Sequence, residues 1–114
     1  MTILTTLVRV VKDTSEAADD AGCFNHDRDT SAVLMHLVEE VGEVALEISI
    51  ENGTSYKKAS EDGVVGEAID VIINALDLIH VHSPELTEKD LIAIAHRKCD
   101  KWLLKVTRTD LVKK

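Results

Sequence analysis

The sequence predicts an all-α fold, in one domain spanning residues 1–114 and built from four helices. Apolar residues recur at helical spacing in four segments, and no segment shows sustained alternation of apolar and polar residues, which a strand would require. One proline and five glycines leave few turns for a sandwich or barrel of many short strands. With 45% apolar and 30% charged residues, the chain has the composition of a globular domain.

The first two helices are expected in the N-terminal half. Apolar residues occupy one helical face early in residues 2–21, a polar stretch follows, and Gly22 is a stop signal. The second helix is expected to begin at Thr30 or Ser31, both suitable capping residues, and to end at Glu51, before an Asn-Gly pair.

The last two helices are also marked by capping residues. The third is expected from about Ser60 to His82. The fourth is expected from the segment Thr87-Glu-Lys-Asp90, a capping box with Asp in place of Glu, to about Lys105. Because the third helix is apolar around well over half of its circumference, we expect it to be buried on several sides, in an interface between copies of the chain.

The net charge and the placement of the charged residues indicate which kinds of partner the chain can bind. Its net charge is −8, which disfavours a general nucleic-acid binder because such proteins need a basic surface. Acidic residues gather in the central segment 29–51, which lacks Lys and Arg, and basic residues gather from Arg97 onward. This arrangement suits a metal and an anion held side by side, but it is also typical of a solvated acidic face and a basic helix end.

Several features favour a cytoplasmic protein with no membrane partner. No apolar run approaches the roughly 20 residues that span a bilayer. The N-terminal segment carries its first charge, Arg9, after the short apolar stretch, unlike a signal peptide. Cys23 and Cys99 match no metal-binding spacing, and we expect reduced thiols that are buried or half-buried.

Two stripes of polar residues stand out on the otherwise apolar second and third helices. At 100° per residue, one stripe contains Glu40, Glu43 and Glu47, and the other contains Glu67, Asp70, Asn74 and Asp77. If these helices pack antiparallel, the stripes face each other, and the converging carboxylates need a cation to offset their repulsion. Such oxygen ligands favour Mg²⁺ or Mn²⁺. A di-iron site is disfavoured because it needs Glu-x-x-His on two helices, and the chain offers only Asp77-x-x-His80.

The residues around these acids resemble a known family. The segments Leu37-Val-Glu-Glu-Val-Gly-Glu43 and Gly66-Glu-Ala-Ile-Asp-Val-Ile-Ile-Asn74 are similar to the motifs of the MazG-like all-α nucleoside triphosphate pyrophosphohydrolases. That family's pattern, Glu-Glu-x-x-Glu followed by Glu-x-x-Asp, is matched without a gap, and the resemblance extends over roughly residues 4–102. It implies a four-helix MazG-like bundle assembled as a homodimer or a dimer of dimers. It also implies Mg²⁺-dependent hydrolysis of a (deoxy)nucleoside triphosphate to the monophosphate and pyrophosphate, as in nucleotide-pool house-cleaning.

The resemblance assigns the metal ligands and leaves one neighbouring acid open. It implies that Glu40, Glu43, Glu67 and Asp70 bind the metal, which is Mg²⁺ or Mn²⁺. Glu39 lies about 100° around the helix from Glu40, so it is expected to act as a catalytic residue that orients or deprotonates water, to bind a second ion, or to be an exposed glutamate.

Nucleotide contacts are predicted at four positions. Relatives often place an aromatic residue against the base where this chain has Phe24, and a lysine-rich stretch that meets the phosphates corresponds to Lys98 and Lys101. Asn74, on the same stripe as Asp70, is expected to bond a sugar hydroxyl or base edge, or to support a carboxylate. Trp102 departs from the Asn or Arg of some relatives.

Two alternative functions remain open for this chain. The first alternative is a non-catalytic helical oligomer or adaptor that only binds a cation, and the second is phosphoribosyl-ATP pyrophosphatase.

His36, one turn before Glu40, is expected to support a ligand or to be buried. The basic fourth helix of one subunit is expected to approach the acidic centre of another.

Overall fold

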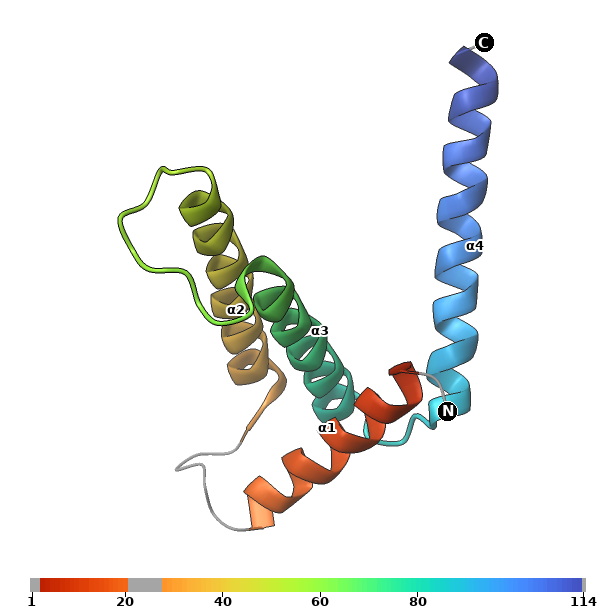
Figure 1. The fold of residues 1–114 in the computed structure, drawn as a ribbon. Coiled ribbons are helices and arrows are strands. Elements are labelled where there is room, and N and C mark those ends of the chain that lie inside the picture. The colour runs from red at the N-terminus through yellow and green to blue at the C-terminus, as the bar shows by residue number, and fades with distance from the viewer. Residues whose placement is uncertain (1–2, 21–27, 114) are drawn as a thin grey trace. The chain divides into compact units, whose positions relative to one another are not determined.

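All regular structure in residues 3–20 and 28–113, the parts that the computed structural model describes, is helical. The helices are α1 (Ile3–Asp20), α2 (Thr30–Glu51), α3 (Gly63–His82) and α4 (Glu88–Lys113) (Figure 1). The predicted all-α class and the four helices are therefore confirmed. The chain forms two compact units, Met1–Pro84 and Glu85–Lys114.

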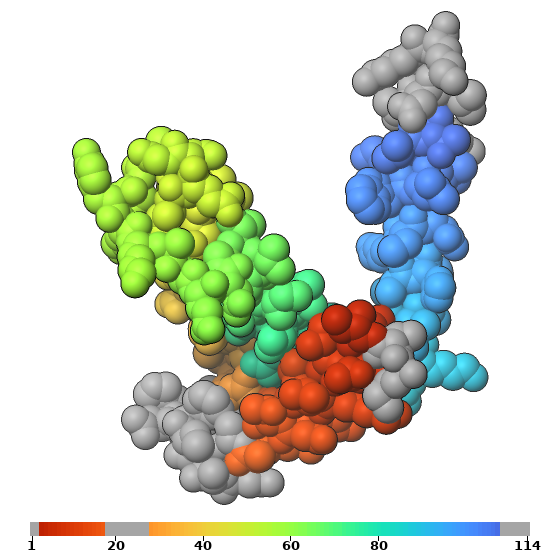
Figure 2. Space-filling view, in the orientation of Figure 1, coloured from red at the N-terminus to blue at the C-terminus, as the bar shows by residue number. Residues whose placement is uncertain are grey.

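In the first unit, α2 and α3 pack side by side and run antiparallel (Figure 1). The segment 52–62 connects them and returns along the end of α2. α1 packs against α3, and Figure 2 shows α1 (red) lying against the C-terminal end of α3 (teal). Val11 and Val33 are the buried apolar side chains in the described part of the chain, so the core is small and aliphatic.

α2 has the predicted bounds, Thr30 and Glu51, whereas its capping residue and the first residue of α3 differ from the expectation. The cap of α2 is Asp29, whose carboxylate accepts a hydrogen bond from the Ala32 amide at 2.8 Å, so the residue before the predicted Thr30 caps the helix. α3 begins at Gly63 and not at Ser60. Gly63 has a φ of +60°, a left-handed conformation that favours glycine and separates the preceding turn from the helix.

The second unit is dominated by α4, whose capping box is confirmed. The Thr87 amide donates to Asp90 Oδ2 at 2.9 Å, and the Asp90 amide donates to Thr87 Oγ1 at 3.2 Å. The helix continues to Lys113, beyond the predicted end near Lys105, because no glycine or proline interrupts it. Cys99 is exposed, so the expectation of a buried or half-buried thiol was wrong for this residue, and Cys23 lies outside the described residues.

Apolar side chains of α2 and α3 remain uncovered within the first unit. No residue of α3 is fully buried, and Val65 is 72% exposed. The exposed apolar residues of the two helices are Leu34, Met35, Val38, Val41, Ile48, Val65, Ile69 and Ile72. Within the described ranges, no helix is long and apolar enough to cross a membrane.

Candidate metal centre

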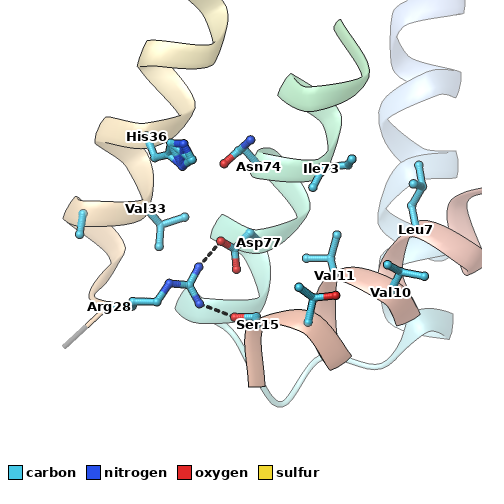
Figure 3. A pocket seen from close by; sticks show the side chains of 12 residues that line it. Leu7, Val10, Val11, Ser15, Arg28, Val33, His36, Ile73, Asn74 and Asp77 are labelled. Atoms are coloured by element: carbon cyan, nitrogen blue, oxygen red, sulfur yellow. Dashed lines mark hydrogen bonds and ion pairs between the residues drawn. The ribbon is translucent and has the colours of Figure 1, made fainter. Parts of the chain in front are cut away.

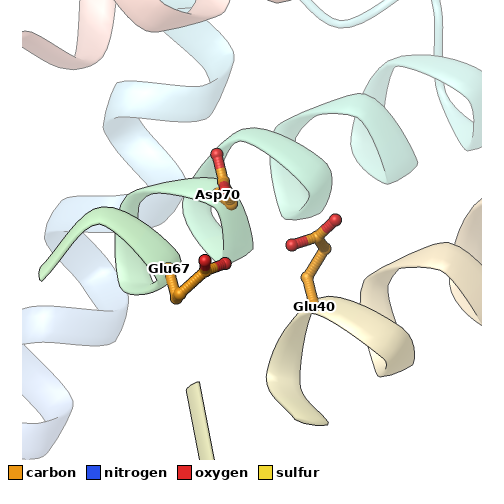
Figure 4. A group of neighbouring side chains, drawn as sticks. All are labelled: Glu40, Glu67 and Asp70. Carbon is orange, nitrogen blue, oxygen red and sulfur yellow. The ribbon is translucent and has the colours of Figure 1, made fainter. Parts of the chain in front are cut away.

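Three carboxylates from α2 and α3 meet between the two helices. Glu40 on α2 and Glu67 and Asp70 on α3 each offer one oxygen, and these atoms all lie within 4.8 Å of one another (Figure 4). Glu67 and Asp70 are neighbours on one helix face because they are three residues apart. The antiparallel packing of α2 brings Glu40 toward them, as the sequence predicted.

The electrostatics of this group favour a bound cation. The pKa of Glu67 is raised above its ordinary value, chiefly because the protein displaces water from its carboxylate and then because Asp70 repels its charge. Glu40 and Glu43 raise the pKa further, while the Ser60 side chain acts in the opposite direction by hydrogen bonding. A divalent cation would replace this repulsion with attraction, and the oxygen donors suit Mg²⁺ or Mn²⁺.

Two further polar side chains contact residues of this group, one at a carboxylate and one at a backbone carbonyl. His36 Nε2 lies 3.4 Å from Glu40 Oε1, although the imidazole itself is exposed, so the histidine supports an acid and is not buried. The Asn74 side-chain amide donates to the backbone carbonyl of Asp70 at 2.8 Å. These two residues therefore lie one turn away from acids of the group, on opposite helices.

The remaining acids of α2 take different positions. Glu43 is exposed and outside the three-carboxylate group, although its charge acts on Glu67. Glu39, the predicted catalytic residue, is also exposed. Glu47, predicted in the same stripe, is buried and accepts a hydrogen bond from the Ser60 amide. The stripe thus divides, and only Glu40 joins the acids of α3.

A pocket of about 560 Å³ lies between α1, α2 and α3, and its lining residues do not include the three carboxylates (Figure 3). His36 and Asn74 face each other at the end nearest the acids, across the space between α2 and α3. The walls are mainly apolar and come from α1, α2 and α3, with lining residues that include Leu7, Val10, Val11, Val33 and Ile73. A concave, largely apolar site with a few polar groups is typical of small-molecule binding.

A polar network closes the other end of this pocket. Arg28 forms an ion pair with Asp77 of α3 and donates a hydrogen bond to the Ser15 hydroxyl of α1 (Figure 3). This role of Arg28 does not follow from the sequence, because its partners lie 49 and 13 residues away and no local spacing connects them. A lone arginine between acidic residues was the only available signal.

The other predicted substrate contacts lie elsewhere in the chain. Lys98 and Lys101 are exposed residues of α4, in the second unit. Phe24 lies outside the described residues.

Comparisons with known proteins do not assign a family. Scans of protein-family models, curated proteins and solved structures found no match to this chain.

Proposed function

We propose that this protein hydrolyses a (deoxy)nucleoside triphosphate to the nucleoside monophosphate and pyrophosphate, with Mg²⁺ or Mn²⁺ as cofactor. The observation that carries the proposal is the group of three carboxylates with oxygens within 4.8 Å of one another. One turn away from these acids, His36 and Asn74 line a pocket large enough for a small molecule. The match of Glu39-Glu40-x-x-Glu43 and Glu67-x-x-Asp70 to the MazG-like pattern supports the same activity. On this proposal the protein acts in house-cleaning of the cytoplasmic nucleotide pool.

The carboxylate group fits a metal that binds phosphate. Glu40, Glu67 and Asp70 would hold the ion, and Glu43, which is close enough for its charge to act on Glu67, would be the fourth ligand. A triphosphate and a group of acids repel each other, so neither can approach the other without a cation between them. When bound, the metal neutralises phosphate charge and lowers the pKa of a coordinated water.

The remaining residues of the site would bind and orient the substrate. The pocket beside His36 and Asn74 would take the nucleoside, with Asn74 at a sugar hydroxyl or base edge and Phe24 against the base. Glu39 would orient or deprotonate the attacking water. Lys98 and Lys101 would meet the phosphates, since ammonium groups bind phosphate as point charges.

The exposed apolar surface favours self-association. The side chains that remain uncovered within the first unit include Leu34, Val38 and Val41 of α2 and Ile69 and Ile72 of α3. Apolar patches beyond a few hundred Å² are uncommon on soluble monomers, and a twofold interface covers one patch with another copy of itself. We therefore propose a homodimer or homotetramer.

A substrate panel tests the activity. The protein is incubated with Mg²⁺ and canonical or damaged (d)NTPs, with phosphoribosyl-ATP as a further substrate, and products are resolved by ion exchange. Monophosphate and pyrophosphate are the expected products, and diphosphate with orthophosphate would overturn the assignment. Cleavage of phosphoribosyl-ATP alone would identify the biosynthetic alternative.

A pair of matched variants connects the activity to the carboxylates. Glu40→Gln removes one charge of the group, and we expect at least a hundredfold loss of kcat/KM. Glu51→Gln removes an exposed charge at the end of the same helix and should leave the activity unchanged. Intact activity in a folded Glu40→Gln variant would contradict the site. Metal binding with no turnover of any substrate would favour the cation-binding adaptor.

A further inference from the structure

Glu47 is the one fully buried acidic side chain in the described part of the chain. Only 4% of the residue is exposed, and it lies two turns after Glu40 on α2. Its Oε1 accepts a hydrogen bond from the Ser60 amide at 2.9 Å, and its Oε2 is buried with no hydrogen-bond partner in the described structure. Burying a carboxylate with incomplete hydrogen bonding costs free energy, so the position calls for an explanation that packing alone does not supply.

The partner of Glu47 belongs to the turn that starts α3. The Ser60 carbonyl accepts a hydrogen bond from the Gly63 amide at 3.3 Å, and α3 begins at Gly63. Both backbone groups of Ser60 are thus used, one to hold α2 and one to hold the start of α3. Through this residue the buried acid of α2 is connected to the helix that carries Glu67 and Asp70.

Ser60 also lies beside the carboxylates themselves. It lines a hollow of about 400 Å³ together with Glu67 and Asp70. Bonded to Glu47 on α2 and to Gly63 at the start of α3, Ser60 connects the buried acid with the helix end that carries these carboxylates. Groups that orient metal ligands in this way tune metal affinity without touching the ion.

We propose that Glu47 and Ser60 are positioning residues for the metal centre: Glu47 fixes Ser60, and Ser60 fixes the start of α3, the helix that carries Glu67 and Asp70 opposite Glu40. Neither residue is a metal ligand in this arrangement. The inference rests on the proposed function, because it assumes that Glu40, Glu67 and Asp70 bind a divalent cation.

The proposal is tested by Mn²⁺ binding to the full chain, measured by calorimetry and by the electron paramagnetic resonance signal of the bound ion. Glu47→Leu removes the acceptor of the Ser60 amide, and we expect roughly tenfold or greater weakening of Mn²⁺ affinity, the usual effect of losing a group that orients ligands. Glu47→Gln keeps an amide oxygen that can accept the same hydrogen bond, so its affinity should stay within a few-fold of the parent, at roughly the scale of one retained hydrogen bond. Glu51→Leu, an exposed position one turn further along α2, is the matched control and should bind as the parent does.

Hydrogen exchange of the Ser60 amide reports the same contact directly. Exchange should be faster in Glu47→Leu than in the parent and nearly unchanged in Glu47→Gln. A Glu47→Leu variant that keeps its helical circular dichroism, exchanges faster at Ser60 and still binds Mn²⁺ like the parent would overturn the proposal.

A second variant decides the matter if Glu47→Leu does not fold. Glu47→Asp keeps the buried charge but shortens the side chain by one methylene, which draws its oxygens away from the Ser60 amide. We expect several-fold weaker Mn²⁺ binding and faster exchange of the Ser60 amide in Glu47→Asp, and parent-like binding together with faster exchange would reject the positioning roles. Unchanged Mn²⁺ binding in Glu40→Gln would refute the metal centre itself. Weakened binding in Glu40→Gln with parent-like binding in both Glu47 variants would refute only the positioning roles.

Discussion

Without a bound cation, the charged form of the Glu67 carboxyl is disfavoured in the folded chain. Its pKa is raised in the folded chain by burial, by Asp70 and by the acids of α2, so the folded state binds its proton more tightly than the unfolded state does. Its contribution to stability therefore falls as the pH rises from the ordinary value of 4.5 through the raised pKa, and the loss is complete above it.

We predict that Glu67→Gln raises the thermal midpoint at pH 7 in the absence of divalent ions, because the variant lacks the charge that is disfavoured there. The difference should shrink as the pH falls toward 4, where the parent carboxyl is protonated in both states. Added Mg²⁺ should raise the midpoint of the parent more than that of the variant, since only the parent keeps the full ligand set. Thermal melts at the two pH values, with and without Mg²⁺, measure this, and a lower midpoint for the variant at pH 7 would contradict it.

The Arg28–Asp77 ion pair affects the free energy of unfolding because both of its charged side chains are largely buried. The two side chains are 12% and 17% exposed, and Asp77 Oδ1 is already buried without a partner in the described structure. Removing the arginine would leave a largely buried carboxylate without its cation. We predict that Arg28→Met lowers the free energy of unfolding by about 3 kcal/mol.

Replacing both partners should cost much less than replacing one. In Arg28→Met/Asp77→Leu the uncompensated charge is gone, so most of the lost stability should return. Urea unfolding of the parent, the two single variants and the double variant closes the cycle. Equal stability of Arg28→Met and the parent would show that the pair does not stabilise the fold.

At the scale of the helix, the residue at position 66 must be small because the side chain of Asp62 lies close to it. A Cβ placed on Gly66 would lie 2.5 Å from the Cβ of Asp62, the residue that precedes α3, whereas a Cβ on Gly42 of α2 would meet nothing within 4 Å. Alanine is favoured over glycine in a helix interior by roughly 1 kcal/mol. The two glycines therefore respond oppositely to the same substitution.

We predict that Gly42→Ala stabilises the protein by about 0.5–1 kcal/mol, because only the helix propensity changes. Gly66→Ala should destabilise it by about 1 kcal/mol, because the clash with Asp62 outweighs the gain in propensity. Since Gly66 precedes Glu67, Mn²⁺ affinity should fall in this variant and stay unchanged in Gly42→Ala. Chemical unfolding and Mn²⁺ titration of the two variants check both parts, and a stabilised Gly66→Ala would show that the turn can relax.

The sequence predicts the helices of this chain well because their signals are local. Apolar periodicity identifies every helix, and the Thr87–Asp90 capping box forms as expected. The ends are less predictable: the start of α3 depends on the positive φ of Gly63, which no neighbouring residue reveals. The Glu67–Asp70 pair follows from helical spacing, whereas the separation of Glu47 from Glu40 depends on where the 52–62 segment packs.

At the scale of the whole molecule, the uncovered apolar residues of α2 and α3 predict a homo-oligomer. Light scattering at micromolar concentration should give a mass of at least twice the 12.5 kDa of one chain. Val41→Asp places a charge within the exposed apolar surface and should shift the mass toward one chain, while Lys57→Asp, on the exposed connecting segment, should not. A parent mass near 12.5 kDa would refute the assembly.

If the site is shared between chains, the oligomer must bring residues of two chains together. The carboxylates belong to the first unit and Lys98 to the second, so a lysine that meets the phosphates can come from the same chain or from a neighbouring one. In a site shared between chains, Glu40→Gln and Lys98→Ala are each inactive or strongly impaired alone, but a mixed dimer contains one site with both native residues. Mixing the two variants under exchanging conditions should restore up to about a quarter of the parent activity, because half of the dimers are mixed when exchange is random and each has one intact site of two. If the variants exchange subunits and no activity returns, each chain completes its own site.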